Sequence, residues 1–404
     1  MTRFDIDVLI FGGGAAGLWL LDELTRRGAD SVLLEAGRLG SGQTVASQGI
    51  IHGGLKYSFS GIVSASARAI ADMPDRWRRC LEGAAEPDLS ATRLRSPHCY
   101  LWATRSVKSR LSLRAASAGL RVRPMRLDDD ERPEVLRDCP GLVMRLDEQV
   151  IAPESFVKAL ADRNPHRLVR IDPDRLKVER RHAGPDVTSI VAAGPGDACT
   201  FEFHPRSVVL AAGEGNAALR RAMGLPDQAM QRRPLHMVVV RGALPRFCGH
   251  CTDGARTRVT ITSDEDAQGR TVWQVGGQVS EDGVEMDQQA LVRHARAELE
   301  ATLPGVVGSD AAWSTYRVDR AEARTADGRR PEHAHVAQDG NVMTAWPTKL
   351  ALVPDLVDRI CGMLPALDGG GDPERQAIEI ASDVVRPEVA PPPWECDLTW
   401  THVD

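Results

Sequence analysis

The sequence predicts an α/β protein with two domains, and three observations carry that prediction. The chain has 404 residues, which is more than one hydrophobic core usually supports. Before residue 36 an apolar run, a glycine cluster, a helical pattern and a second apolar run follow one another. Between residues 229 and 316 several short β patterns occur. We therefore expect a nucleotide-binding βαβ domain joined to an α+β domain with a mixed sheet.

The first of these segments reads as a complete strand–turn–helix–strand unit. Asp7–Phe11 is an apolar run with β-branched members, which predicts a short buried strand. Gly12–Gly17 follows at once and fits the pattern G-x-G-x-x-G. Leucines at helical spacing lead to Gly28, and a second strand over residues 31–34 ends at Glu35. This order is the dinucleotide-binding fingerprint in its full context.

Each residue type in the fingerprint has a physical task. Gly12 permits a tight turn, Gly14 lets a pyrophosphate approach the backbone, and Gly17 lets the helix pack closely on the strand. The N–H groups that begin the helix attract phosphate. Glu35 is placed to accept ribose hydroxyls, and its charge would repel the 2′-phosphate of NADP. The fingerprint itself leaves FAD and NAD open.

Composition and charge are those of an ordinary globular protein. Hydrophobic residues make up 42% and charged residues 26%, and the net charge is −6. This balance offers no basic field to nucleic acid. No apolar run reaches the length of about 18 residues that a spanning helix needs, and the acidic start is unlike a secretion signal. We expect a cytoplasmic protein without a nucleic-acid partner or a transmembrane segment, with peripheral contact at the inner membrane face left open.

Eight cysteines are scattered along the chain, and we expect reduced thiols. Cys248 and Cys251 form one C-x-x-C pair. Neither a second ligand pair nor a thioredoxin-like pattern accompanies it, so the sequence predicts no metal site.

Three further segments have the character of ligand-binding loops. Gly37–Tyr57 is a long run of glycine and small polar residues, which indicates an extended segment that offers N–H groups and hydroxyls to a ligand. Ser207–Gly213 is an apolar strand that ends in small residues. Gly340–Ala351 joins a short strand, a loop containing Thr348 and Lys349, and the start of a helix.

On these segments the sequence resembles the D-amino-acid oxidase superfamily of flavoproteins, and within it the FAD-dependent glycerol-3-phosphate dehydrogenases most. Those proteins carry a small-polar stretch that ends in an I-H-G-G-L-R-Y type motif, matched here by Ile51–Tyr57 with Lys56 in the place of arginine. Thr348–Ala351 also matches, whereas Ala345–Pro347 replaces the glycines that the superfamily has before it. The resemblance covers roughly residues 5–60 and 205–360, in patches.

The resemblance implies FAD as the cofactor, in a Rossmann-like domain of the glutathione-reductase and D-amino-acid-oxidase type with an inserted substrate domain. The expected FAD-binding domain spans 1–80, 150–228 and 317–365, the substrate domain spans 81–149 and 229–316, and a C-terminal tail spans 366–404. The residues expected to bind the cofactor are Gly12, Gly14, Ala15, Ala16, Gly17, Glu35, Ala36, Gln43, Thr44, Ser47, Gln48, Gly49, Ile50, Val178, Ala212, Gly213, Thr348, Lys349 and Leu350.

Flavin chemistry on an alcohol or amine carbon also needs a base and a cation that holds the substrate's acid group. His52 is the candidate base, because imidazole titrates near neutral pH; a hydrogen-bonded structural histidine is the alternative. Lys349, at a helix start, is expected to stabilise negative charge on flavin or substrate. Arg317 stands where the superfamily often binds an anion, with Arg320 as the neighbouring alternative, and Lys56 is a further substrate-binding candidate.

The predicted activity is transfer of a hydride from a small polar, anionic hydroxy or amino substrate to flavin N5. Glycerol 3-phosphate, a 2-hydroxy acid and an amino acid all fit, and the electron acceptor is a quinone, oxygen or a protein. One alternative is an NAD(P)H-using flavin monooxygenase, since Gly213–Ala218 fits G-x-G-x-x-A, although no acidic residue closes the next strand. Another is an RNA-modifying flavoprotein, against which the acidic charge balance speaks. Substrate, acceptor, covalent flavin attachment and oligomeric state stay open.

Overall fold

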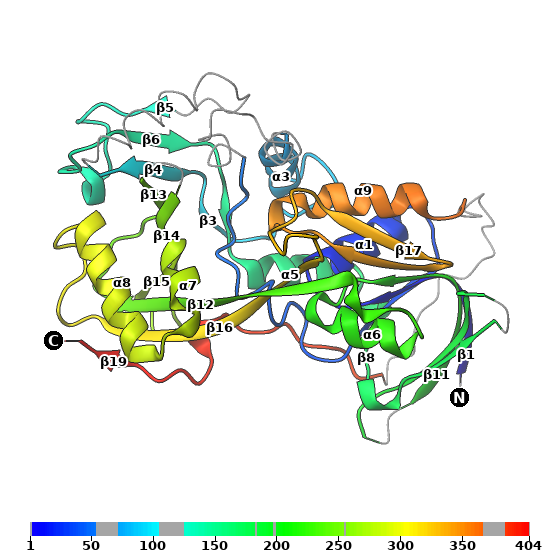
Figure 1. Cartoon of the computed structure of the whole chain (residues 1–404). Coiled ribbons are helices and arrows are strands. Elements are labelled where there is room, and N and C mark those ends of the chain that lie inside the picture. Colours follow the sequence, from blue (N-terminus) through cyan, green and yellow to red (C-terminus); the bar gives the residue numbers. More distant parts are fainter. Residues whose placement is uncertain are drawn as a thin grey trace.

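The computed structural model describes residues 2–53, 72–104, 125–181, 184–196, 199–253, 256–366 and 384–403. Over these ranges the chain is organised around two large sheets, which Figure 1 shows side by side. The first sheet carries the N-terminal nucleotide-binding unit, and the second is built mainly from the middle of the chain.

The first sheet is parallel at its centre. β1 pairs in parallel with β2 on one side and with β11 on the other, and β11 continues in parallel to β18. β17 and a β9–β10 flap add antiparallel pairs at the margins. The strands are β1 (Thr2–Phe11), β2 (Ser31–Glu35), β8 (Leu168–Arg170), β9 (Lys177–Arg180), β10 (Val187–Ala193), β11 (Thr200–Leu210), β17 (His335–Asp339) and β18 (Val342–Trp346).

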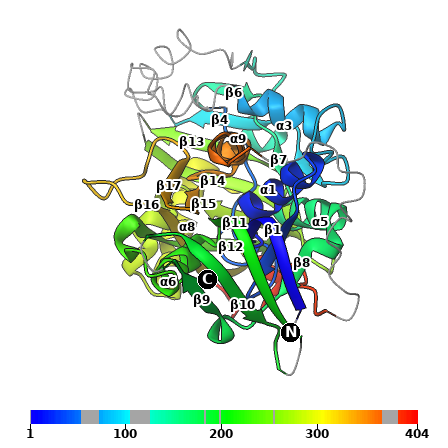
Figure 2. The same cartoon turned by 90° about the vertical axis from the view of Figure 1, so that its right-hand side faces the viewer.

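Both faces of the central strands are covered, because their side chains are apolar on both faces. Figure 2 shows α1 and α9 on one side of β1 and β11, and the β9–β10 flap on the other. Val8 and Ile10 pack under the helices, whereas Leu9 and Phe11 pack under the flap. Trp19 of α1 meets Trp77 of α3 edge-on, with ring centroids 4.9 Å apart. The helices are α1 (Ala15–Arg26), α3 (Met73–Leu81), α5 (Pro153–Arg163), α6 (Asn216–Ala222) and α9 (Val353–Met363).

The second sheet is mixed. β4 and β13 pair in parallel, while the other neighbours in this sheet are antiparallel. Trp102 and Trp273 are fully buried in the core that this sheet forms with Leu291 and Leu299 of α8. The strands are β4 (Cys99–Ala103), β5 (Met125–Arg126), β6 (Val143–Leu146), β12 (Met230–Gly242), β13 (Gly249–Asp253), β14 (Arg256–Glu265), β15 (Thr271–Gly276), β16 (Ala312–Ala323) and β19 (Thr401–His402), with α7 (Gln278–Asp282) and α8 (Gln288–Thr302) packed on them.

The two sheets are connected by long strands and by the C-terminal segment. β12 and β16 pair along their whole length and extend from the second sheet toward the first (Figure 1). β3 (Leu94–Ser96) and β7 (Val150–Ile151) pair in a small sheet of their own, and each stands where the chain passes from one large sheet to the other. Leu39 N donates to Glu388 O at 2.7 Å, and Ala390 N donates to Leu39 O at 2.9 Å. β19 then joins β16, so the described part of the predicted tail contacts both sheets.

The predicted fold class is confirmed, since the structure combines a parallel nucleotide-binding sheet with a mixed second sheet. The predicted domain boundaries stay a proposal. Among the described residues, none of the helices combines the length and the apolar character that a membrane span requires.

The C-x-x-C pair does not form a joint site. Cys248 packs in a cluster with Leu101 and Leu146, whereas Cys251 belongs to the cluster around Trp102. Burial raises the pKa of both thiols, that of Cys251 to about 12. Two thiols that are directed into different cores and stay protonated have the character of packing residues.

Candidate functional site

A cavity of about 860 Å³ lies at the carboxyl ends of the central strands of the first sheet. Phe11, Glu35, Ala211 and Trp346, which end or directly follow β1, β2, β11 and β18, line it. Its volume falls in the range of small-molecule sites. Open α/β sheets bind their ligands at this edge, because the strands end there and the loops diverge.

The glycine turn forms one wall of the cavity, and its geometry explains the glycines. Gly12 has φ +104°, and a Cβ there would lie 2.5 Å from Ala212 Cα. A Cβ on Gly17 would lie 2.0 Å from Gly12 O, because α1 packs directly on the turn. On Gly14 the nearest atom to a Cβ would be Thr44 Oγ1 at 3.1 Å. Gly14 is therefore the glycine whose missing side chain leaves room on the cavity side.

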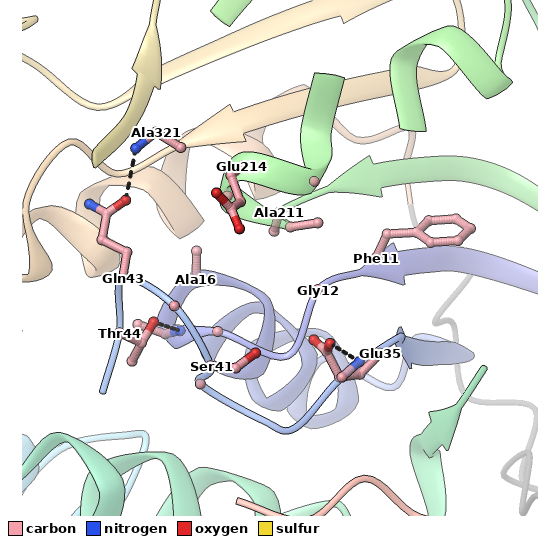
Figure 3. A pocket seen from close by; sticks show the side chains of 18 of the residues that line it. Phe11, Gly12, Ala16, Glu35, Ser41, Gln43, Thr44, Ala211, Glu214 and Ala321 are labelled. Carbon is pink, nitrogen blue, oxygen red and sulfur yellow. Dashed lines mark hydrogen bonds between the residues drawn. The ribbon is translucent and has the colours of Figure 1, made fainter. Parts of the chain in front are cut away.

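The start of α1 is suited to an anion. No side-chain hydrogen bond caps Gly14, and the first turn holds no acidic residue. Ala15 N donates to Thr44 Oγ1 at 3.3 Å, which brings a hydroxyl to the same place (Figure 3). Backbone N–H groups at a helix start bind phosphate well. These residues fit the pyrophosphate of a dinucleotide.

Two backbone hydrogen bonds fix the Glu35 carboxylate at the end of β2. Its Oε2 accepts from Gly13 N at 2.6 Å, and its Oε1 accepts from Gly37 N at 2.6 Å. Figure 3 shows this carboxylate beside the glycine turn. Two backbone donors fix the carboxylate at the cavity wall, where a ribose diol would meet it.

The segment after Glu35 is tied to the second sheet, and glutamine side chains make most of the ties. Gln43 Oε1 accepts from Ala321 N at 3.1 Å (Figure 3). Gln48 Nε2 donates to Thr260 O and to Gln274 O, both at 3.0 Å. Tyr316 donates its hydroxyl to Ala46 O at 2.9 Å. The loop that borders the cavity is thus positioned by the sheet opposite to it.

The same segment then runs along residues 149–151. Gly49 has φ +72°, and a Cβ there would lie 2.0 Å from Ile151 O. Ile51 N donates to Gln149 O at 2.8 Å. This pairing fixes the residue that follows, His52, against Glu148.

The half-buried His52 forms a cluster with Glu148 and His250, which are both fully buried. His52 Nδ1 lies 3.5 Å and His250 Nε2 lies 3.7 Å from Glu148 Oε2. Gly53 N donates to Glu148 Oε1 at 2.7 Å, and His250 Nδ1 lies 2.9 Å from Thr260 Oγ1. Burial favours the neutral acid, but the imidazoles of His250 and His52 outweigh it and hold the pKa of Glu148 well below its usual range. Glu148 is therefore ionised at neutral pH.

The loop before α9 carries a buried lysine. Lys349 lines the cavity and is 8% exposed. Thr348, the residue before it, is β-branched and has φ +64°, and its hydroxyl donates to His333 O at 2.9 Å. A left-handed backbone costs such a residue on the order of 1–3 kcal/mol, and strain of this kind is typical of ligand sites.

The predicted arginines differ in their surroundings. Arg317 lines the cavity, and its guanidinium donates to Val284 O and Met286 O at 2.8 and 2.9 Å. Arg320 is paired with Glu281 at 3.2 Å and is not among the described residues that line the cavity. Lys56 lies outside the described residues.

The predicted cofactor residues divide into two groups. Those that line the cavity are Gly12, Gly14, Ala15, Ala16, Glu35, Ala36, Gln43, Thr44, Ser47, Ala212, Gly213, Lys349 and Leu350. Those that the described cavity wall does not include are Gly17, Gln48, Gly49, Ile50, Val178 and Thr348. In the chain segment that precedes Val178, the residues that line the cavity are Ile171, Pro173 and Leu176.

Sequence reasoning did not single out Glu148 or Trp346. Glu148 stands in a short polar stretch before β7 and reads as a turn residue, so only the fold brings it to His52. Trp346 replaces a residue that the superfamily keeps small, and its fully buried indole lines the cavity. The replacement of the superfamily's glycines by Ala345–Pro347 was the signal in the sequence that could have marked Trp346.

Comparison with known proteins agrees with this geometry. The family model described as DAO, FAD dependent oxidoreductase, matches residues 7–346. The "Probable FAD-dependent oxidoreductase PA4991" of Pseudomonas aeruginosa is 40% identical over 394 residues, which are 96% of this chain and 97% of that protein. The crystal structure of PA4991 superposes with a TM-score of 0.80 at 37% identity, over 98% of this chain and 99% of that one.

Two more distant structures share the fold. Glycine oxidase from Geobacillus kaustophilus has a TM-score of 0.60 at 18% identity, over 89% of this chain and 95% of that one. L-α-Glycerophosphate oxidase from Mycoplasma pneumoniae, solved with FAD bound, has a TM-score of 0.63 at 15% identity, over 91% and 98%. With the family match, the relative and a cavity that fits a dinucleotide, the chain belongs to the DAO family of FAD-dependent oxidoreductases, and FAD is its cofactor.

Proposed function

We propose that this enzyme oxidises a small polar, anionic hydroxy or amino compound, such as glycerol 3-phosphate, a 2-hydroxy acid or an amino acid. The observation that carries the proposal is the presence of two cations, Lys349 and Arg317, on the wall of the cavity that holds the nucleotide turn. Two cationic side chains on the wall of one cavity favour a ligand that carries negative charge. FAD, when bound, supplies the hydride acceptor at its N5 atom.

The substrate must also lose a proton from its hydroxyl or amino group. We assign the uptake of that proton to His52, whose Nδ1 lies 3.5 Å from the Glu148 carboxylate. His52 follows the segment that borders the cavity and is not among the described residues that line it. Lys349 stabilises negative charge, and Arg317 holds the acid group of the substrate. Arg320 is a weaker candidate, because Glu281 already neutralises its charge.

The names of the structural relatives support the chemical class. Glycine oxidase and L-α-glycerophosphate oxidase are named after an amino acid and a phosphate ester. Both compounds are small and carry an anionic group next to an oxidisable carbon. The proposal keeps that common chemistry and leaves the individual substrate to experiment.

The test is anaerobic reduction of the FAD-loaded protein by single compounds. We expect the visible flavin bands to bleach with sn-glycerol 3-phosphate, a 2-hydroxy acid or an amino acid. NADH serves as a separate arm, and bleaching with NADH alone would replace the proposal by a monooxygenase. If no compound bleaches the flavin, the anionic substrate class is wrong.

Lys349→Ala tests the assigned cation. We expect the rate of flavin reduction by the substrate to fall roughly 10²-fold to 10³-fold, because a preorganised charge near the reacting atoms is lost. The affinity for FAD should change much less. Lys158→Ala is the matched control, since Lys158 is an exposed lysine of α5 paired with Asp162. Reduction of the Lys349 variant at the wild-type rate would end the assignment.

A further inference from the structure

We propose that Glu148 and His250 are positioning residues for His52. In this arrangement the Glu148 carboxylate accepts one N–H from each imidazole, which keeps the proton of His52 on Nδ1 and leaves Nε2 as the atom that takes the substrate's proton. The inference rests on the proposed function, because it explains how His52 would serve as the base.

The first support is the convergence of the three side chains. Glu148 Oε2 faces both His52 Nδ1 and His250 Nε2, and the three atoms lie within 4.8 Å of one another. The separations of 3.5 and 3.7 Å exceed a hydrogen bond of about 2.7–3.2 Å. Both separations lie within the reach of an ion pair, about 4 Å.

The second support is the anchoring of the carboxylate. Gly53 N donates to Glu148 Oε1 at 2.7 Å, so one carboxylate oxygen is held by the residue that follows His52. Ile51 N donates to Gln149 O at 2.8 Å, which ties the two chain segments together on the other side. The backbone therefore sets the position of Glu148 relative to the His52 ring. Oε2 is the carboxylate oxygen that faces the imidazoles.

The third support is the state of His250. Its ring is fully buried, and Nδ1 lies 2.9 Å from Thr260 Oγ1 on the neighbouring strand, where the two residues are direct partners. If the Thr260 hydroxyl donates to Nδ1, the His250 proton lies on Nε2 and is directed to Glu148. A buried carboxylate is tolerated only with such donors around it. Gly53, His52 and His250 together supply three.

The chemistry follows from this order of donors and acceptors. The substrate's O–H or N–H bond breaks, and its proton forms a bond with His52 Nε2. The electron pair of the broken bond closes the C=O or C=N bond of the product while the carbon loses its hydride, for which FAD is the acceptor. The positive charge now on His52 lies beside the Glu148 carboxylate, as in other carboxylate–histidine pairs that stabilise an imidazolium.

Glu148→Gln is the decisive variant. Because Gly53 N–H must keep an oxygen partner, the amide oxygen replaces Oε1 and the NH₂ group faces His52 Nδ1. Nδ1 then has to accept, and the ring proton moves to Nε2, where it blocks the base. Long-range ¹H–¹⁵N NMR of ¹⁵N-histidine-labelled, FAD-loaded protein reads the protonated nitrogen directly, and His52→Asn identifies the His52 signals. We expect Nδ1–H in the wild type and Nε2–H in the variant.

Kinetics provide the second readout. With a substrate that bleaches the flavin, Glu148→Gln should lower the reduction rate roughly 10²-fold to 10⁴-fold and leave KM and FAD affinity within about threefold, since no binding contact is removed. Glu148→Asp keeps the charge and should restore part of the rate. Asp266→Asn is the control, because Asp266 is a buried carboxylate paired with Arg270 in the turn between β14 and β15.

Three results would overturn the inference. One is a His52 tautomer that Glu148→Gln does not change. Another is a wild-type reduction rate in that variant. The third is a divalent metal that copurifies in stoichiometric amount and is lost in the variant, because the same His–Glu–His set offers metal ligands. If no compound reduces the wild-type flavin, the proposed function fails, and the NMR measurement still decides whether Glu148 positions His52.

Discussion

Single side chains at the cavity are held in place by the backbone, and Glu35 is the clearest case. Both carboxylate oxygens accept from backbone N–H groups at 2.6 Å, one from Gly13 and one from Gly37. A glutamine there can satisfy one donor with its oxygen and must turn its NH₂ group toward the other. The residue therefore shapes the turn, and we propose that it also offers an acceptor to ribose.

Glu35→Gln should weaken FAD binding roughly 10-fold to 100-fold, because hydrogen bonds to a charged acceptor contribute about 1.5–3 kcal/mol. Titration of the FAD-free protein, followed by flavin fluorescence, measures the effect. Glu300→Gln is the control, since Glu300 is exposed on α8 in the second domain proposed above. An unchanged Kd would show that Glu35 is not in contact with the nucleotide.

His236 shows the opposite situation, a histidine held by structure alone. Its ring is buried, with Nδ1 near Gly283 O and Met286 O at 3.1 and 3.2 Å and Nε2 2.9 Å from Thr315 Oγ1. Burial lowers the pKa of His236, and the nearby Arg317 adds to that, although the two carbonyls oppose it. The folded state thus prefers the neutral ring.

The sign of the resulting pH dependence follows from linkage. Above the unfolded-state pKa of about 6.5 the ring is neutral in both states. As pH falls below that value the unfolded chain binds the proton first, so stability decreases. Between pH 7.5 and 5.5 the urea midpoint should fall less in His236→Gln than in the wild type, although the variant is less stable at pH 7.5. Equal declines in the two proteins would mean that His236 titrates normally when folded.

At the scale of elements, different glycines of the turn are needed for folding and for ligand binding. A Cβ on Gly17 would meet Gly12 O at 2.0 Å, a backbone atom that cannot move away without shifting α1. A Cβ on Gly14 would meet only the Thr44 hydroxyl, at 3.1 Å, and would occupy the cavity side. Gly17 therefore serves the packing of helix on strand, and we propose that Gly14 serves the approach of the ligand.

Gly17→Ala should lower the melting temperature of the FAD-free protein, because overpacking costs about 1–3 kcal/mol or more. Gly14→Ala should melt close to the wild type without FAD but bind FAD at least about tenfold more weakly, since one methyl group fills the space of the pyrophosphate. Melting curves with and without FAD separate the two effects. The assignment of the two glycines would be reversed if Gly14→Ala were the less stable of the pair.

The sequence could predict elements that local patterns determine, but it could not predict contacts between distant segments. The strand–turn–helix unit up to Glu35 and the strands around residues 236, 260 and 273 were predictable, because local periodicity and glycine placement determine them. The Glu148–His250 pair was not, because residues about one hundred positions apart meet only through the pairing of two extended segments. Nothing local marks a carboxylate whose partners come from distant parts of the chain.

At the scale of the whole molecule, the C-terminal segment connects the two sheets. Residues 388–390 exchange backbone hydrogen bonds with Leu39, directly before Gly40 in the cavity wall. Trp394 is buried against Val239 and Val272 of the second sheet, and β19 pairs with β16. The segment thus holds both the nucleotide loop and the sheet opposite to it.

Because the C-terminal segment contacts both sheets, we expect one change in it to lower stability alone and another to lower both stability and FAD retention. Trp394→Ala should destabilise the protein by about 3–5 kcal/mol through the cavity it leaves, with FAD affinity nearly unchanged, because Trp394 packs on the second sheet. A chain that ends at residue 383 should lose stability and also release FAD at a lower temperature, since Leu39 loses its two backbone partners. Flavin fluorescence reports the release, and circular dichroism reports unfolding. If the shortened chain retained FAD as firmly as Trp394→Ala does, the segment would only cover the second sheet, and the cavity wall around Gly40 would have to be held by α1 and α5 alone.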